Sequence, residues 1–244
     1  YRGITIWECP PNGQGIAALM ALNIVEGFDL LDMRPQSADV YHYLIEAMRL
    51  AFADALQYVA DPRVVAVPIA DMLSKDYAAR RRQLIDPDAA LQSVSFGRLS
   101  SPGDTVYVTA VDGQGNACSL INSLYHSFGS GLVVPTTGIA LQNRGALFSL
   151  DPDHPNFIQG RKRPYQTIIP GMATKDGELW LSFGVMGGFQ QPQGHLQVIS
   201  NMVDFGLDAQ RALDALRFHV DVTGKVEVKL EAGVSIETVA GLRK

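Results

Sequence analysis

A hydroxyl residue at the start of an apolar strand pattern is the feature of this sequence best placed to do chemistry. Thr105 opens the β-branched and aromatic run 105–111, which is typical of a strand, and it directly follows the flexible segment 100–104. A hydroxyl needs a base to become a nucleophile, and the α-amino group of an N-terminal threonine can serve as its own base. That chemistry requires cleavage of the bond between Asp104 and Thr105. An ordinary strand start is the alternative interpretation.

A pair of glycines supplies the second candidate for chemistry. Gly187 and Gly188 follow an apolar strand pattern and precede a helical one. Such a turn can present backbone N–H groups to a developing oxyanion, although a tight turn without chemistry has the same sequence. The Gly-x-Ser-x-Gly elbow of serine hydrolases and a phosphate-binding glycine loop are missing from the sequence. The histidines are dispersed without metal-ligand spacing, so we expect no metal and no cofactor.

The elements that must position these residues can be read from periodicity and turn chemistry. A β-hairpin is expected over 105–124, and helices over 16–25, 38–59 and 193–205. Two further strands are expected at Thr167–Ile169 and Leu179–Phe183, on either side of a glycine turn. Helices, then strands, then helices predict a layered α+β domain.

Composition limits the class of protein. The chain has 244 residues, 47% of them hydrophobic and 18% charged, as in ordinary globular proteins. A net charge of -5 argues against a nucleic-acid partner, and no apolar run approaches the ~18 residues that span a membrane. The two cysteines do not form a disulfide framework, which indicates a reducing, cytoplasmic location. Because the sequence begins with Tyr1 rather than Met, a lost leader would leave a periplasmic or secreted location open.

Several motifs occur in one order along the chain: Tyr1-Arg2-Gly3, Pro10-Pro11-Asn12-Gly13-Gln14-Gly15, Gly103-Asp104-Thr105, Phe128-Gly129-Ser130-Gly131, Lys162-Arg163-Pro164, Gly187-Gly188 and Asp204-Phe205-Gly206-Leu207. Together they resemble the γ-glutamyltranspeptidase family of N-terminal-nucleophile hydrolases, over essentially the whole chain. The resemblance implies an αββα sandwich and a precursor that cuts itself before a threonine, which Thr105 matches. Residues 1–104 would then be the C-terminal part of a large subunit and 105–244 the N-terminal part of a small one, forming a heterodimer with one αββα domain.

The resemblance also implies roles for individual residues. Ser123 stands where the family has a threonine that hydrogen-bonds the nucleophile, and Gly187 and Gly188 match its oxyanion-hole pair. Leu147 replaces the acidic residue that holds a substrate amino group. A leucine cannot pair with an ammonium group, so this departure argues against γ-glutamyl recognition.

Five other segments are Tyr125-His126, Gln142-Asn143-Arg144-Gly145, Pro164-Tyr165-Gln166-Thr167, Gly184-Val185-Met186-Gly187-Gly188 and Gln191-Pro192-Gln193-Gly194-His195. They resemble the oxamate amidohydrolase branch, whose members hydrolyse a small acidic amide. Gln166 and Thr167 replace the serines that grip the glutamyl carboxylate in the wider family, and together with Tyr125 they are expected to line the pocket. Arg144 is the candidate partner for a substrate carboxylate, because a guanidinium binds a carboxylate through two hydrogen bonds; a surface salt bridge is the alternative. His126 either lines the pocket or bonds a loop carbonyl.

Two hypotheses about function follow. The first is a self-cleaving amidohydrolase or acyltransferase with Thr105 as nucleophile, acting on γ-glutamyl amides such as glutathione or on a small acidic amide such as oxamate. The second is a non-catalytic fragment, a structural piece of a larger heterodimer. Both leave the chain without a nucleic-acid or membrane partner.

Overall fold

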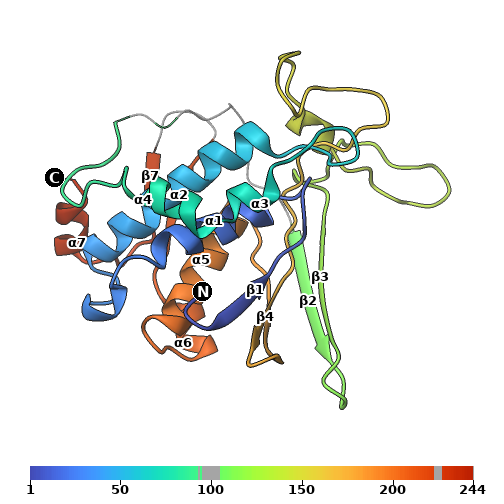
Figure 1. Ribbon diagram of the computed structural model, residues 1–244. Coiled ribbons are helices and arrows are strands. Elements are labelled where there is room, and N and C mark those ends of the chain that lie inside the picture. The colour runs from blue at the N-terminus through green and yellow to red at the C-terminus, as the bar shows by residue number, and fades with distance from the viewer. Residues whose placement is uncertain (93, 95–104, 223–226, 244) are drawn as a thin grey trace.

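The computed structural model describes residues 1–92, 94, 105–222 and 227–243 (Figure 1). Asp104 and most of the expected segment before Thr105 lie outside the described residues. The helices are α1 (Gly15–Val25), α2 (Ala38–Tyr58), α3 (Ile69–Met72), α4 (Lys75–Arg82), α5 (Gln190–Val203), α6 (Ala209–Asp214) and α7 (Ile236–Gly241), with 3-10 turns η1 (Leu30–Asp32) and η2 (Arg144–Leu147). The strands are β1 (Ile4–Trp7), β2 (Thr105–Val111), β3 (Ala117–Ser123), β4 (Gly171–Lys175), β5 (Glu178–Phe183), β6 (Phe218–Asp221) and β7 (Glu227–Leu230).

Helix α1 is the centre of the helical layer. It carries no charged residue and is buried on nearly all sides, because α2 and α5 both pack against it (Figure 1). Helix α2 begins where expected, with the Ser37 hydroxyl accepting a hydrogen bond from the Val40 amide. A helix that is apolar all round must be interior, so α1 is a rigid base for the loop that precedes it.

Strands β1, β4 and β5 form an antiparallel sheet in the order β1-β4-β5. Thr5 of β1 is paired with Thr174 of β4, so the sheet joins the chain before Thr105 to the chain after it. The prediction of a strand at 167–169 was wrong, since the strand begins only at Gly171. At Thr167 the backbone carbonyl accepts a hydrogen bond from the Gln14 side chain instead of from a neighbouring strand.

The hairpin predicted over 105–124 is confirmed as β2 and β3, with Thr105 directly opposite Ser123. The hairpin has its own two-stranded ladder and is attached to the other strands by hydroxyl groups. Thr109 Oγ1 donates to Ser182 Oγ at 2.7 Å, and Ser119 Oγ donates to the Gly171 carbonyl at 3.0 Å.

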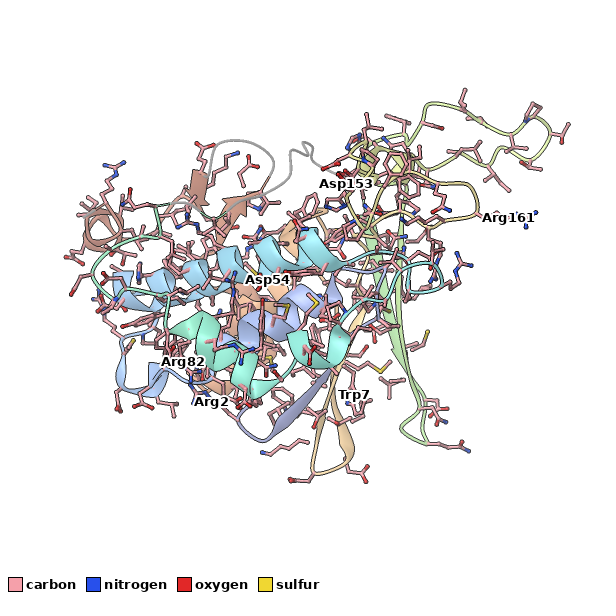
Figure 2. All side chains as sticks on the ribbon, turned by 45° about the horizontal axis from the view of Figure 1, so that its top comes forward. Arg2, Trp7, Asp54, Arg82, Asp153 and Arg161 are labelled. Atoms are coloured by element: carbon pink, nitrogen blue, oxygen red, sulfur yellow. The ribbon has the colours of Figure 1, made fainter. Side chains whose placement is uncertain are left out.

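The architecture is α+β, as predicted, with the helices on one side of strands β1 to β5, while the β6–β7 pair packs among the helices (Figure 1). The long irregular segment after β3 extends away from the helices; Figure 2 shows Asp153 and Arg161 there, far from Arg82 of α4. None of the described helices is both long and apolar enough to cross a membrane. Within the same ranges, no three His, Cys, Asp or Glu side chains gather closely enough to hold a metal ion.

Candidate active site

The candidate nucleophile lies at the first position of β2, half-buried, with its hydroxyl turned toward β3. Thr105 Oγ1 donates to Ser123 Oγ at 3.1 Å, as expected for residues paired directly across a hairpin. Ser123 Oγ also accepts a hydrogen bond from the Tyr125 amide at 3.0 Å, so the Ser123 side chain is held in one orientation. The pairing expected between Thr105 and Ser123 is therefore present in the structure.

Arg144, on η2, is buried with only 3% of its surface exposed. Its guanidinium donates to Thr167 Oγ1 at 2.5 Å and to the Ser123 carbonyl at 3.3 Å, and it lies over the Tyr125 ring at 5.5 Å. Nowhere in the described ranges does Arg144 form an ion pair with a carboxylate, which rules out the surface salt bridge considered above. Burial lowers the pKa of Arg144 to about 10, because a buried cation without a counter-charge is costly.

The loop before α1 joins Thr167 to the glycine pair. Gln14 is fully buried, and its Nε2 donates to the Thr167 carbonyl at 2.7 Å and to the Gly188 carbonyl at 2.8 Å. Each residue in the series Thr105, Ser123, Arg144, Thr167, Gln14 and Gly188 is therefore hydrogen-bonded to the next, through side-chain atoms at some links and backbone carbonyls at others. Residues far apart in the sequence converge on one site.

The glycine pair forms a turn that only glycine adopts without strain. Gly187 has a φ of +110° and Gly188 a φ of +59°. Among the hydrogen bonds of the described chain, none uses the amide hydrogen of Gly187 or Gly188. The turn can therefore offer backbone donors to an incoming oxyanion. Gly184, just before it, is in contact with the ring of Tyr107 on β2, which brings this segment to the nucleophile's strand.

Tyr125 and His126 form a stacked pair, with ring centroids 4.3 Å apart. Tyr125 is 2% exposed and has a φ of +79°, an unfavourable value for an aromatic residue that is common at functional sites. Burial also raises the pKa of the Tyr125 hydroxyl. His126 Nδ1 bonds the side-chain amide of Asn143 at 2.8 Å, so the loop carbonyl considered for it is not its partner.

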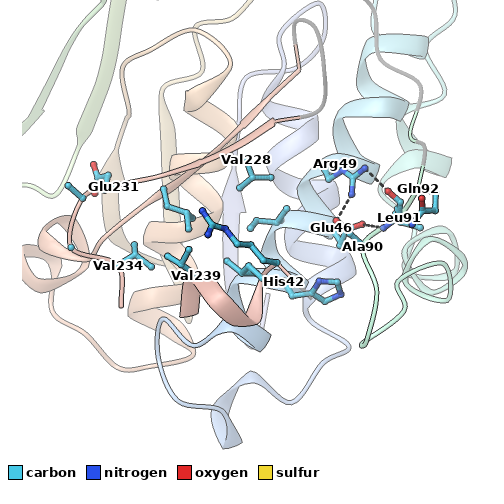
Figure 3. Close-up of a pocket in the computed structure, with 16 residues that line it drawn as sticks. His42, Glu46, Arg49, Ala90, Leu91, Gln92, Val228, Glu231, Val234 and Val239 are labelled. Carbon is cyan, nitrogen blue, oxygen red and sulfur yellow. Dashed lines mark hydrogen bonds and ion pairs between the residues drawn. The ribbon is translucent and has the colours of Figure 1, made fainter. Parts of the chain in front are cut away.

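Two cavities are relevant to the choice of site. The smaller, of about 410 Å³, is lined by Thr105, Ser123, Asn122 and neighbouring apolar side chains. The larger, of about 730 Å³, lies between α2, α7 and β7 beside the Glu46–Arg49 ion pair (Figure 3). No serine, threonine or cysteine is among the residues found to line the larger cavity, so its lining supplies no hydroxyl or thiol nucleophile. We take the cavity beside Thr105 as the candidate reaction site.

The family model described as gamma-glutamyltranspeptidase matches residues 1–244. The chain belongs to the γ-glutamyltranspeptidase family. It is 38% identical to a glutathione hydrolase-like proenzyme of Bacillus subtilis over 89% of this chain and 41% of that protein. It is 34% identical to the oxamate amidohydrolase proenzyme of Klebsiella pneumoniae over 98% of this chain and 45% of that protein.

The structural comparison supports the same relationship. The solved structure of a cephalosporin acylase from Bacillus halodurans is 48% identical, with a TM-score of 0.89, over 100% of this chain and 43% of that one. The N-terminal-nucleophile hydrolase fold class predicted from the sequence is thereby confirmed. The chain spans less than half the length of these γ-glutamyltranspeptidase-family relatives.

Several residues depart from what the sequence suggested, since Tyr125, His126, Arg144, Gln166 and Thr167 are not among the residues found to line the cavity beside Thr105. Leu147, which replaces the family's acidic residue, is 3% exposed and packs in the hydrophobic core, outside the lining of the cavity beside Thr105. Gln166 contributes its backbone, donating to Asn12 and accepting from Gln14, while its side chain bonds the Thr167 amide. The sequence reasoning missed Gln14 as a site residue; its position between two glycines in the loop before α1 was the available signal.

Proposed function

We propose that the complete protein containing this chain is an N-terminal-threonine amidohydrolase that cleaves itself before Thr105 and then hydrolyses a small amide bearing a carboxylate. The observation that carries the proposal is the buried Arg144 guanidinium, which has no carboxylate partner in the described part of the chain and is one hydrogen bond from Ser123. A substrate carboxylate would supply the missing counter-charge.

The chemistry assigned to each group follows from its position. After cleavage, the free α-amino group of Thr105 takes the proton of Oγ1, and Oγ1 attacks the amide carbon. The negative charge that develops on the carbonyl oxygen meets the amide hydrogens of the Gly187–Gly188 turn. The C–N bond breaks, the departing amine receives the proton, and the acyl group remains as an ester on Thr105. Water then hydrolyses the ester and restores the hydroxyl.

The charges around the site favour an acidic substrate without an amino group. No aspartate or glutamate is among the residues found to line the cavity beside Thr105, so an ammonium group has no anionic partner there. Arg144 also lies outside that lining, but its guanidinium donates to the carbonyl of Ser123, which is a lining residue, and so brings positive charge next to the cavity. Oxamate, a small amide next to a carboxylate, fits this arrangement better than a γ-glutamyl group, which carries both charges.

Cleavage before Thr105 would leave the pieces 1–104 and 105–244 firmly associated. Strand β1 of the first piece is paired with β4 of the second. Asp61 of the first piece is buried and forms an ion pair with Arg163 of the second at 3.0 Å. A stable heterodimer is therefore the expected product of self-cleavage.

The direct test replaces the nucleophile in the complete protein. Thr105→Ala should abolish both self-cleavage and hydrolysis of oxamate, because a methyl group cannot supply the attacking oxygen. Thr105→Ser, which keeps a hydroxyl, should retain part of both activities. Band patterns on denaturing gels and release of ammonia measure the two steps. Maturation and turnover by the alanine variant would refute the assignment.

A further inference from the structure

We infer that Gln14 is the positioning residue of the oxyanion-stabilising turn and couples this turn to the Arg144–Thr167 pair. The inference rests on the proposed function and adds to it a residue that neither the sequence analysis nor the family resemblance assigned to the site. Gln14 does not line the cavity beside Thr105 and has no role as nucleophile, base or substrate contact. Its effect would be exerted entirely through the two carbonyl groups that its side-chain amide holds.

The orientation of the Gln14 amide is fixed by its partners. Backbone carbonyls accept hydrogen bonds and cannot donate them, so Nε2 must face Thr167 and Gly188. Oε1 is buried and, in the described part of the chain, has no hydrogen-bond partner. A buried polar atom without a partner is destabilising, so stability alone does not explain an amide here. The need to hold two carbonyls at once does explain it.

The Gly188 carbonyl lies in the peptide plane that follows the one carrying the Gly188 N–H, so its partners restrict the turn on the C-terminal side of Gly188. The preceding peptide plane is fixed because the Gly187 carbonyl accepts from the Gln190 amide at 3.0 Å. The following plane is fixed by Gln14 and, more weakly, by the Gln191 amide at 3.2 Å. The Gly188 N–H shares its peptide plane with the Gly187 carbonyl, which points toward the start of α5. Because the N–H and the C=O of a trans peptide point in opposite directions, the Gly188 N–H points away from α5. The hydrogen bond from Gln14 thus restrains the second of the two peptide planes that meet at Gly188, and it limits the wide range of φ and ψ values open to glycine.

The backbone of Gln14 is held rigidly in place. Its backbone precedes the buried helix α1, where its carbonyl accepts from the Ala17 amide at 2.9 Å. Its own amide donates to the Gln166 carbonyl at 3.0 Å, beside Thr167. The side chain therefore has little freedom to follow a shifted turn, and the turn and the Arg144–Thr167 pair are held in one fixed relation.

The experiment compares Gln14→Leu with a matched control in the complete protein. Gln197 is the control because it is also buried, and its Nε2 also donates to two carbonyls, Gln193 at 3.0 Å and Phe218 at 3.2 Å, away from the site. Unlike Gln14, it also accepts a hydrogen bond through Oε1, from the Phe218 amide at 2.9 Å. We expect Gln14→Leu to lower kcat for oxamate roughly tenfold to a hundredfold and to raise KM, because removal of an oxyanion donor itself costs about a hundredfold or more. Gln197→Leu should lower Tm at least as much while leaving kcat and KM close to wild type.

A second variant gives a readout that a purely structural role would not move. In Gln14→Glu the ionised carboxylate repels both carbonyls, whereas the protonated form can donate one hydrogen bond; burial raises the pKa of such a carboxyl group. The ratio of variant to wild-type kcat should therefore rise as the pH is lowered. A flat ratio, or a Gln14→Leu enzyme with the kinetics of Gln197→Leu, overturns the inference. Hydrolysis by Thr105→Ala would instead refute the proposed function, whatever the Gln14 variants do.

Discussion

Replacement of Arg144 by methionine isolates the contribution of one buried charge to substrate choice. Methionine keeps an unbranched apolar chain in the same space but removes the guanidinium and its bonds to Thr167 and Ser123. Loss of one partner of a buried, hydrogen-bonded charge pair costs about 2–5 kcal/mol. At 1.4 kcal/mol for each tenfold change, a loss of about 3 kcal/mol is roughly a hundredfold in kcat/KM for a carboxylate substrate.

The assay compares oxamate with its methyl ester, which presents the same amide without the negative charge. The ratio of the two kcat/KM values cancels changes in the chemical step that affect both substrates. We expect Arg144→Met to lower the oxamate-to-ester ratio roughly a hundredfold relative to wild type. Arg144→Lys should recover part of the ratio, because lysine keeps the charge without the two-pronged geometry.

The stability of the Arg144→Met protein is the internal control. Removal of an unpaired buried cation relieves a desolvation penalty, while the loss of two hydrogen bonds costs about 1–3 kcal/mol. These effects oppose one another, so Tm should change little. A variant that loses the same factor on oxamate and on the ester, or that unfolds well below the wild type, would refute the role assigned to Arg144.

Three further outcomes follow from the same structure. The value of kcat/KM for oxamate should fall as the pH rises through about 10, where Arg144 loses its charge, while kcat/KM for the ester should show no such loss. Gly187→Ala should cost about 1–3 kcal/mol in unfolding and lower kcat, because φ is +110° at that position. Hydrogen bonds from Arg63 and Arg163 hold the pKa of Asp61 well below its usual range. The stability that Asp61 contributes is therefore present above about pH 4 and lost as the pH falls further, and denaturant unfolding of Asp61→Asn should not show this dependence.

The hairpin and its nucleophile could be predicted from the sequence because their signals are local. Strand-forming residues on either side of the turn around Asp112 fix the register, and the register alone places Thr105 opposite Ser123. The helical assignments succeeded for the same reason, since apolar periodicity and the Ser37 cap lie within a few residues of each other.

The rest of the site depends on contacts between distant segments, which local patterns do not report. Gln14 bonds carbonyls 153 and 174 residues further along the chain. The burial of Arg144 follows from the packing of Tyr125 and Thr167 around it, not from its own neighbours in the sequence. A strand was expected at 167–169 because the β-branched residues there have a high strand propensity. The strand does not form because the backbone of this segment is hydrogen-bonded to the loop before α1. The cytoplasmic location stays a prediction; Cys9 and Cys118 are exposed and unpaired.

The central claim is that Thr105 becomes the N-terminal residue that attacks the amide. Mass spectrometry of the purified complete protein, combined with N-terminal sequencing of its fragments, tests that claim most directly. We expect two chains, with the smaller beginning at Thr105, and a single intact chain for Thr105→Ala. A wild-type protein that hydrolyses oxamate while its chain remains uncut before Thr105 would contradict it.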